Sequence, residues 1–155
     1  MIALTFGVLL QIASRLPPSA FPGLPYAVRQ ELVERRCLTP RLAPLRRRHN
    51  VVRGSFERPG QIDWAVLCST RGVSRILVFW NGDPARVTEL ARGPDHGLRI
   101  LGVVGRDFIV SHHRANGGPP LPPTRHQGIE DIVMEKASVV YYRYRGRWLV
   151  LAGTD

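Results

Sequence analysis

From Asn50 onward, hydrophobic residues fall into short runs separated by Gly, Pro, Asn and Asp, a pattern typical of strands joined by tight turns. The clearest runs lie at residues 51–56, 62–69, 73–80, 87–91, 98–104 and 138–144. Residues 107–112 continue the pattern behind a Gly-first turn, and residues 129–134 and 147–151 complete it. We therefore expect a mainly β (α+β) fold: an antiparallel sheet or sandwich of about 7–8 short strands with one N-terminal helix.

The helix is predicted ahead of the strands. Leu24, Val28 and Leu32 recur at a spacing of four and define one apolar side. We expect the helix to end near Cys37, because Pro40 cannot continue it.

Two of the predicted strands have no polar face. Residues 64–67 and 76–80 are apolar at consecutive positions, whereas a strand with one solvated face would alternate. Such strands are expected at the centre of a sheet that is covered on both sides. The N-terminal helix is one candidate cover.

The first residues of the chain form a segment of their own. Residues 2–13 are apolar and uncharged, shorter than the about 20 residues of a transmembrane helix but similar in length to the hydrophobic region of a signal peptide. We interpret residues 1–20 as a signal peptide; the alternative is an apolar segment that packs on the domain. Residues 15–25 carry four prolines and indicate a linker. Residues 24–155 are then expected to form a single β-rich domain.

The chain has a formal net charge of +10, which is a property of many nucleic-acid-binding proteins. However, all 22 basic residues except Lys136 are Arg, and they are scattered, with one cluster at Arg46, Arg47 and Arg48. Replacement of Lys by Arg is more typical of the codon bias of a GC-rich genome than of a binding face. The sequence therefore argues against nucleic acid as the partner. Binding of an anionic polymer or nucleic acid through Arg46–Arg48 is kept as the second alternative function.

Residues 54–66, GSFERPGQIDWAV, resemble one FG-GAP (VCBS-type) repeat, in which a G-D-F-x-x-D-G-x-x-D motif forms a strand, a calcium loop and a second strand. Together with residues 72–80 (GVSRILVFW) and 135–155 (EKASVVYYRYRGRWLVLAGTD), this stretch resembles uncharacterised exported bacterial proteins with a single degenerate repeat of this kind. The repeat implies calcium, but the positions that need oxygen ligands hold Ser55, Glu57 and Pro59. We expect instead a tight turn with Gly60 at positive φ and Asp63 capping it. No metal or cofactor is predicted.

The most unusual segment is the loop at residues 113–127, which carries four prolines. Long loops in compact domains are often functional, so we expect it to present a binding surface in which Arg114, His126 and Asp131 contact the ligand. Their replacement by Ala is expected to cost little stability. A small hydrolase or lyase that uses His112, His126 and Asp131 for acid–base catalysis is the alternative. None of these spacings is diagnostic of zinc.

Cys37 and Cys68 are the only two cysteines, and their spacing is neither that of a zinc site nor that of a redox pair. We predict a disulfide that joins the end of the helix to a central strand. Together with the N-terminal segment, it indicates a periplasmic or secreted protein; without a signal peptide the protein would be cytoplasmic. No integral membrane segment is expected in the mature domain. The leading hypothesis is a non-enzymatic extracytoplasmic binding module for an unknown ligand or protein partner.

Overall fold

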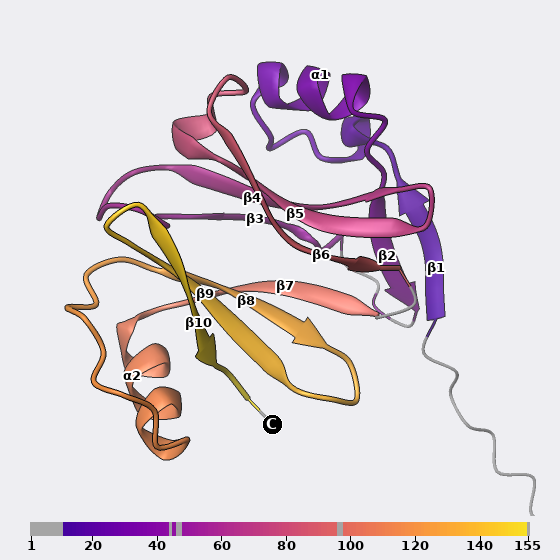
Figure 1. Cartoon of the computed structure of the whole chain (residues 1–155). Helices are drawn as coiled ribbons and strands as arrows, with labels where there is room; N and C mark the ends of the chain where they lie inside the picture. The colour runs from indigo at the N-terminus through magenta and orange to yellow at the C-terminus, as the bar shows by residue number, and fades with distance from the viewer. Residues whose placement is uncertain (1–10, 44, 46–47, 96–97, 155) are drawn as a thin grey trace, which may run out of the picture.

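A computed structural model describes residues 11–43, 45, 48–95 and 98–154 (Figure 1). Within these residues the chain forms ten strands in three antiparallel sheets, and two α-helices. The mainly β class and the antiparallel pairing are confirmed, whereas the strands are more numerous than expected and the second helix was not expected. The elements are β1 (Gln11–Leu16), α1 (Tyr26–Glu34), β2 (Thr39–Ala43), β3 (Val51–Gly54), β4 (Asp63–Thr70), β5 (Val73–Phe79), β6 (Val87–Pro94), β7 (Arg99–Val104), α2 (Arg106–Ala115), β8 (Gly128–Val133), β9 (Ser138–Tyr144) and β10 (Arg147–Ala152).

Two four-stranded sheets pack face to face, and each carries a helix on its outer side (Figure 1). The first sheet has the order β3-β4-β5-β6 and lies under α1, and the second has the order β10-β9-β8-β7 and lies against α2. The core between the sheets consists of side chains from both: Phe56, Ala65, Leu67, Ile76, Val78, Trp80, Leu101 and Ile129. The layers therefore follow the order helix, sheet, sheet, helix.

The prediction that two strands are covered on both faces is confirmed at β4 and β5. Successive side chains of a strand point to opposite faces. Val66 and Leu77 pack under α1 against Val28, while Ala65 and Ile76 pack between the two sheets. The predicted helix is thus one cover, and the second sheet is the other.

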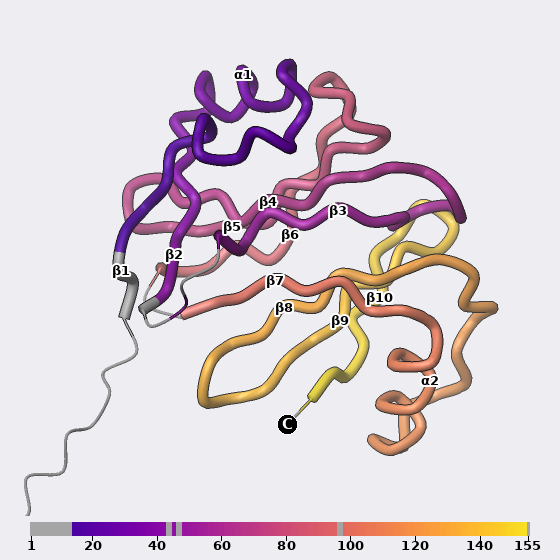
Figure 2. Tube along the Cα trace, turned by 180° about the vertical axis from the view of Figure 1, so that it is seen from behind, coloured from indigo at the N-terminus to yellow at the C-terminus, as the bar shows by residue number. Residues whose placement is uncertain are grey.

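The segment before α1 is part of the packed structure. β1 pairs with β2 to form a two-stranded ribbon beside the first sheet (Figure 2). Phe21 and Leu24 are 7% and 2% exposed and belong to the core under α1, so the expectation that residues 15–25 form a linker is wrong. Three of the prolines fit this packing: Pro17 and Pro18 begin a 3-10 turn (Pro18–Ala20) and Pro25 is the N-cap of α1, positions where no helical backbone donor is lost. Residues 1–10, the first half of the predicted signal peptide, lie outside the described residues.

The expected strand at residues 107–112 is instead the helix α2, so the predicted hairpin turn before it is also wrong. Gly105 has an extended backbone (φ −92°, ψ −179°) and is the N-cap of this helix. Asp107 in the first turn and basic residues in the last complement the helix dipole. Ile109 is fully buried against the second sheet, and the Phe108 and His112 rings stack with centroids 3.9 Å apart. A helix brings residues four apart onto one side, whereas a strand would separate them along its length.

The predicted disulfide between Cys37 and Cys68 is present, with the two Cα atoms 5.1 Å apart. It joins the chain after α1 to the β4 strand, as the sequence predicted. Both cysteines are buried in the core under α1. In the part of the chain that the structure describes, no helix has both the length and the apolar character needed to cross a membrane.

Candidate functional site

The segment that connects α2 to β8, residues 116–127, is called the proline loop below. Three clefts adjoin it, with volumes of about 520, 460 and 630 Å³. Volumes of this size are typical of small-molecule sites. The long loop singled out by its prolines therefore borders concave surface along most of its length.

The proline loop is anchored at both ends. At its end, the Gln127 amide donates to the Ser55 carbonyl (2.8 Å), and the Gln127 side-chain oxygen accepts from the Ser55 amide (2.9 Å). In its second half, the Arg125 amide donates to the buried Tyr142 hydroxyl (3.0 Å). At its start, the His113 ring lies at hydrogen-bond distance from a loop carbonyl and fills the space where a side chain on Gly118 would sit. These contacts, with the fixed φ of the prolines, hold the loop in one conformation.

Two of the clefts lie on either side of the first half of the proline loop. We call the 520 Å³ cleft between the loop and α2 the outer cleft; Arg106 and Arg114 line it together with His113. The 630 Å³ cleft between the loop and the β9–β10 hairpin is called the apolar cleft, and its walls include Trp148 and the exposed Val150. Loop residues 119–122 line both.

The third cleft, called the arginine cleft, has a volume of about 460 Å³ and lies at the far end of the proline loop. It is built from three segments that are distant in the sequence: the β3–β4 connection, the end of the loop, and the β9–β10 turn. Its lining residues are Glu57, Arg58, Pro59, Pro123, Arg125, His126, Tyr142, Arg143, Tyr144 and Arg145. Four of these residues are arginines and one is a glutamate, which gives a formal charge of +3 from the Arg and Glu side chains alone.

Aromatic rings hold two of these arginines in place. The Arg143 guanidinium carbon lies 5.4 Å from the ring centroids of both Trp80 and Trp148, whose own centroids are 5.6 Å apart. Arg145 lies 5.3 Å from the centroid of Tyr144. Cation–π contacts of this kind fix the position of a guanidinium without neutralising its charge.

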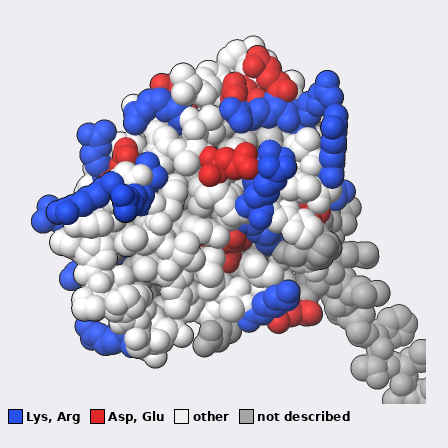
Figure 3. Space-filling model, viewed as in Figure 1, with Lys and Arg blue, Asp and Glu red and all other residues white. Residues whose placement is uncertain are grey.

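Basic side chains gather at this end of the molecule, where the β3–β4 connection and the β9–β10 turn lie side by side (Figure 3). Arg58, Arg125 and Arg145 are exposed. None of these three forms an ion pair with any residue that the structure describes. The positive charge of the arginine cleft is therefore not compensated from within the described part of the protein.

The two predicted histidines have different surroundings. His126 lines the arginine cleft, but its ring stacks on Tyr142 with centroids 4.3 Å apart, and its Nδ1 and Nε2 atoms lie 2.9 and 2.8 Å from the carbonyls of Gln127 and Arg143. Both ring nitrogens thus lie within hydrogen-bond distance of a backbone carbonyl, and a neutral ring can donate to one of the two. His112 stacks on Phe108 in α2, with its Nδ1 atom 3.0 Å from the Phe108 carbonyl. Neither histidine hydrogen-bonds a carboxylate within the described structure.

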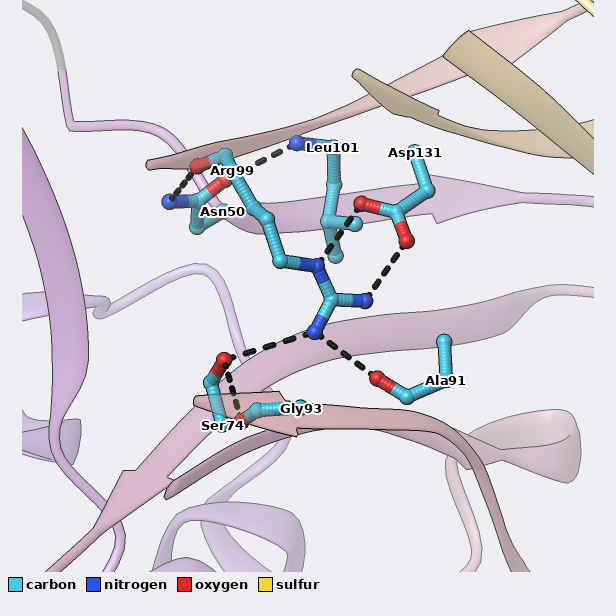
Figure 4. Close-up of polar contacts among 7 residues, drawn as sticks. All are labelled: Asn50, Ser74, Ala91, Gly93, Arg99, Leu101 and Asp131. Atoms are coloured by element: carbon cyan, nitrogen blue, oxygen red, sulfur yellow. Dashed lines mark hydrogen bonds and ion pairs between the residues drawn. The ribbon is translucent and has the colours of Figure 1, made fainter. Parts of the chain in front are cut away.

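Asp131 lies between the two sheets, where it forms a buried ion pair with Arg99 (Figure 4). The Arg99 Nε and Nη2 groups donate to the two carboxylate oxygens at 2.9 and 2.6 Å. The side chains of Arg99 and Asp131 are only 8% and 5% exposed. The structure therefore does not bring Asp131 together with His112 or His126, and its replacement by Ala is expected to be costly rather than neutral.

Of the three residues predicted to bind, two border the clefts. Arg114 is exposed on the outer cleft and His126 lines the arginine cleft, whereas Asp131 lines none of the three clefts described above. Among the basic cluster, Arg46 and Arg47 lie outside the described residues, and Arg48 is exposed and donates to the Ala20 carbonyl.

The segment that resembles a calcium repeat forms the expected turn. Gly60 has φ 78°, and Asp63 is fully buried. The Asp63 carboxylate accepts hydrogen bonds from the amides of Phe56 and Asn81, both at 2.8 Å, and from the side chain of Gln61 at 2.6 Å. This carboxylate thus closes the β3–β4 connection that carries Arg58. Within the described residues, no three His, Cys, Asp or Glu side chains lie close enough together to hold a metal ion.

Sequence reasoning did not find the residues that make the arginine cleft. Arg58, Arg125 and Arg145 are separated by at least twenty residues in the chain and belong to no motif. One signal was available: Arg143 and Arg145 alternate with tyrosines around a two-residue turn, which places charge and aromatic rings together at a hairpin tip. Comparisons add no further guide, because no family model, curated protein or solved structure matches the chain.

Proposed function

We propose that the protein is a non-enzymatic, extracytoplasmic binding module whose ligand lies against the proline loop. The observation that carries this proposal is the convergence of the three clefts on one anchored loop. A loop that is already fixed loses little conformational freedom when a ligand binds, which favours affinity.

The contacts of His126 and Asp131 favour a binding function over a catalytic one. Acid–base catalysis needs a base within hydrogen-bond reach of the substrate, together with a group that orients it. The ring nitrogens of His126 lie within hydrogen-bond distance of backbone carbonyls, and Asp131 is buried against Arg99. These contacts do not support the hydrolase or lyase alternative.

The compartment is supported by the disulfide. A bridge between Cys37 and Cys68 persists in oxidising surroundings such as the periplasm or the cell exterior and is rare in the cytosol. A ligand would then be met outside the cytoplasm.

The test is a ligand screen by thermal shift, followed by titration of each hit against variants. The panel contains neutral oligosaccharides, multivalent anions and apolar peptides. Leu121→Ser changes a loop residue that lines both the outer and the apolar cleft. The matched control is Val33→Ser, at an exposed apolar residue of α1 on the opposite side of the molecule.

Arg125→Gln changes a loop residue that lines the arginine cleft. We expect at least one hit that raises the melting temperature of the wild type and loses affinity about tenfold in Leu121→Ser or in Arg125→Gln, but not in Val33→Ser. Circular dichroism confirms that the variants are folded. The proposal would be refuted if every hit bound both loop variants as tightly as the wild type, or if the panel gave no hit.

A further inference from the structure

We infer that the arginine cleft binds a small multivalent anion that carries phosphate or carboxylate groups. This inference rests on the proposed function, because the cleft adjoins the end of the proline loop, and it adds the chemical class of the ligand. Guanidinium groups are well suited to such ligands, since their planar donors match the oxygens of phosphate and carboxylate in pairs.

The first argument is the uncompensated charge. Among the described arginines only Arg15, Arg35, Arg75 and Arg99 pair with a carboxylate, so an arginine without such a partner is common in this protein. The cleft differs from the rest of the surface because four unpaired arginines line one hollow. The arginines of the cleft have no such partner among the described residues, although Glu57 is part of the same lining. Like charges placed side by side repel one another. An anion in the cleft would relieve that repulsion.

The second argument is that the cleft is already assembled. Arg143 is held over Trp80 and Trp148, and Arg145 lies over Tyr144. The backbone of Arg125 is held by the hydrogen bond from its amide to the Tyr142 hydroxyl. Much of the cost of bringing these charges together has therefore been met in folding, and it does not reduce the affinity for a ligand.

The third argument concerns size. The arginines come from three segments and line one cleft of about 460 Å³, which is the scale of a small molecule. A long polymer bound through its backbone would be contacted by an extended row of cations. The described arginines of this site form a cluster around a hollow instead, which favours a compact ligand with several charges.

The experiment is isothermal titration of the full chain at low ionic strength with inorganic pyrophosphate and with citrate, which separate phosphate from carboxylate recognition. Glucose is the neutral control. Arg58→Gln and Arg125→Gln each remove one exposed charge from a different wall. Arg92→Gln is the matched control, since Arg92 is an exposed arginine of β6 that lines none of the three clefts.

We expect pyrophosphate or citrate to bind with 1:1 stoichiometry, and each cleft variant to weaken that binding about tenfold or more, or about 1.4 kcal/mol. Arg92→Gln is expected to bind as the wild type does. Binding should weaken as salt is added, because the contacts are electrostatic.

Three results would overturn the inference: no binding of either anion, cleft variants that bind the anion as tightly as the wild type, or equal losses in Arg92→Gln. If the small anions did not bind but a single-stranded oligonucleotide did, unaffected by Arg58→Gln and Arg125→Gln, a polymer site elsewhere would be favoured. If no anion bound but a neutral ligand bound and lost affinity in Leu121→Ser, the proposed function would stand and only the inference of an anionic ligand would be refuted. Anion binding that needs Arg58 and Arg125 but is followed by hydrolysis of the bound pyrophosphate to phosphate would do the reverse, because the proposed function is non-enzymatic.

Discussion

Replacing Asp131 by Ala should destabilise the protein strongly, because it would leave the Arg99 guanidinium buried without its counter-charge. Arg99 is a member of β7, yet its side chain reaches across to the other sheet (Figure 4). Its Nη1 group donates to the Ala91 carbonyl at 2.7 Å and to the Ser74 hydroxyl at 3.3 Å. Asp131 thus neutralises the group that joins β7 and β8 to β5 and β6.

The size of the effect follows from burial. Removing one member of a buried, hydrogen-bonded ion pair costs about 3–5 kcal/mol, because the remaining charge has lost its solvent and its partner. For a chain of this length each kcal/mol lowers the melting temperature by about 2–4 °C, so Asp131→Ala should lower it by roughly 6–20 °C. In the double variant Arg99→Met/Asp131→Leu no charge is left unpaired. The loss of unfolding free energy in the double variant should therefore be smaller, by about 1–3 kcal/mol, than the summed losses of Arg99→Met and Asp131→Leu.

Urea unfolding followed by circular dichroism measures these free energies. The matched control is Glu89→Ala, which breaks the exposed pair between Arg75 and Glu89 at 3.4 Å. That change should cost less than about 1 kcal/mol, because exposed pairs contribute little. If Asp131→Ala cost no more than Glu89→Ala, or if the effects of the single variants simply added, the pair would not hold the two sheets together as argued.

Three further predictions follow from the core. Reducing the Cys37–Cys68 disulfide, which spans 31 residues, should lower the free energy of unfolding by about 3–4 kcal/mol, measured by urea unfolding with and without reductant. Gly128→Ala should cost about 1–3 kcal/mol, since a Cβ there would lie 2.7 Å from a β9 methyl group, whereas Gly23→Ala, in open space, should change the melting temperature little. Burial, and next the Asp131 carboxylate, raise the pKa of Tyr141 above its usual 10.0, although Arg99 lowers it. A raised folded-state pKa means that stability is complete below about pH 10 and is lost as the pH rises above it. Urea unfolding between pH 9 and 11 should therefore show a larger loss in the wild type than in Tyr141→Phe.

The central strands could be predicted because a local feature of the sequence, an uninterrupted run of apolar residues, marks each of them. β4 and β5 are apolar at consecutive positions, and this pattern fits only strands that are covered on both sides. The disulfide could be predicted as well, because one cysteine ends the helix segment and the other lies in a central strand. The sequence indicates that both faces of these strands are covered, but the pattern of the strands does not identify the element on the far side, because a sheet and a helix both cover a face with apolar side chains.

The errors fall where local pattern and tertiary contact compete. Residues 107–112 have a short apolar run, and length alone does not separate a strand from a buried helix. The packing of Ile109 on the second sheet stabilises the helix. β2 was missed because Pro40 disfavours a strand interior, yet β2 pairs through its whole length with β1, and the Pro40 carbonyl accepts from the buried Asn50 side chain.

The scatter of the arginines shows why composition is a weak guide to a binding surface in a fold of this kind. In an antiparallel sandwich, turns that are far apart in the sequence meet at the same end of the sheets. The β3–β4 connection and the β9–β10 turn are separated by more than eighty residues, and both line the arginine cleft with the end of the proline loop. A dispersed set of arginines can therefore form a compact cluster without any motif. A basic site differs from a solvated basic surface in that its charges share a cleft, lack carboxylate partners and are held in place. The cleft arginines meet the first two conditions, and Arg143 and Arg145 also meet the third. The affinity for an anion, rather than the net charge of the chain, is therefore the quantity to measure.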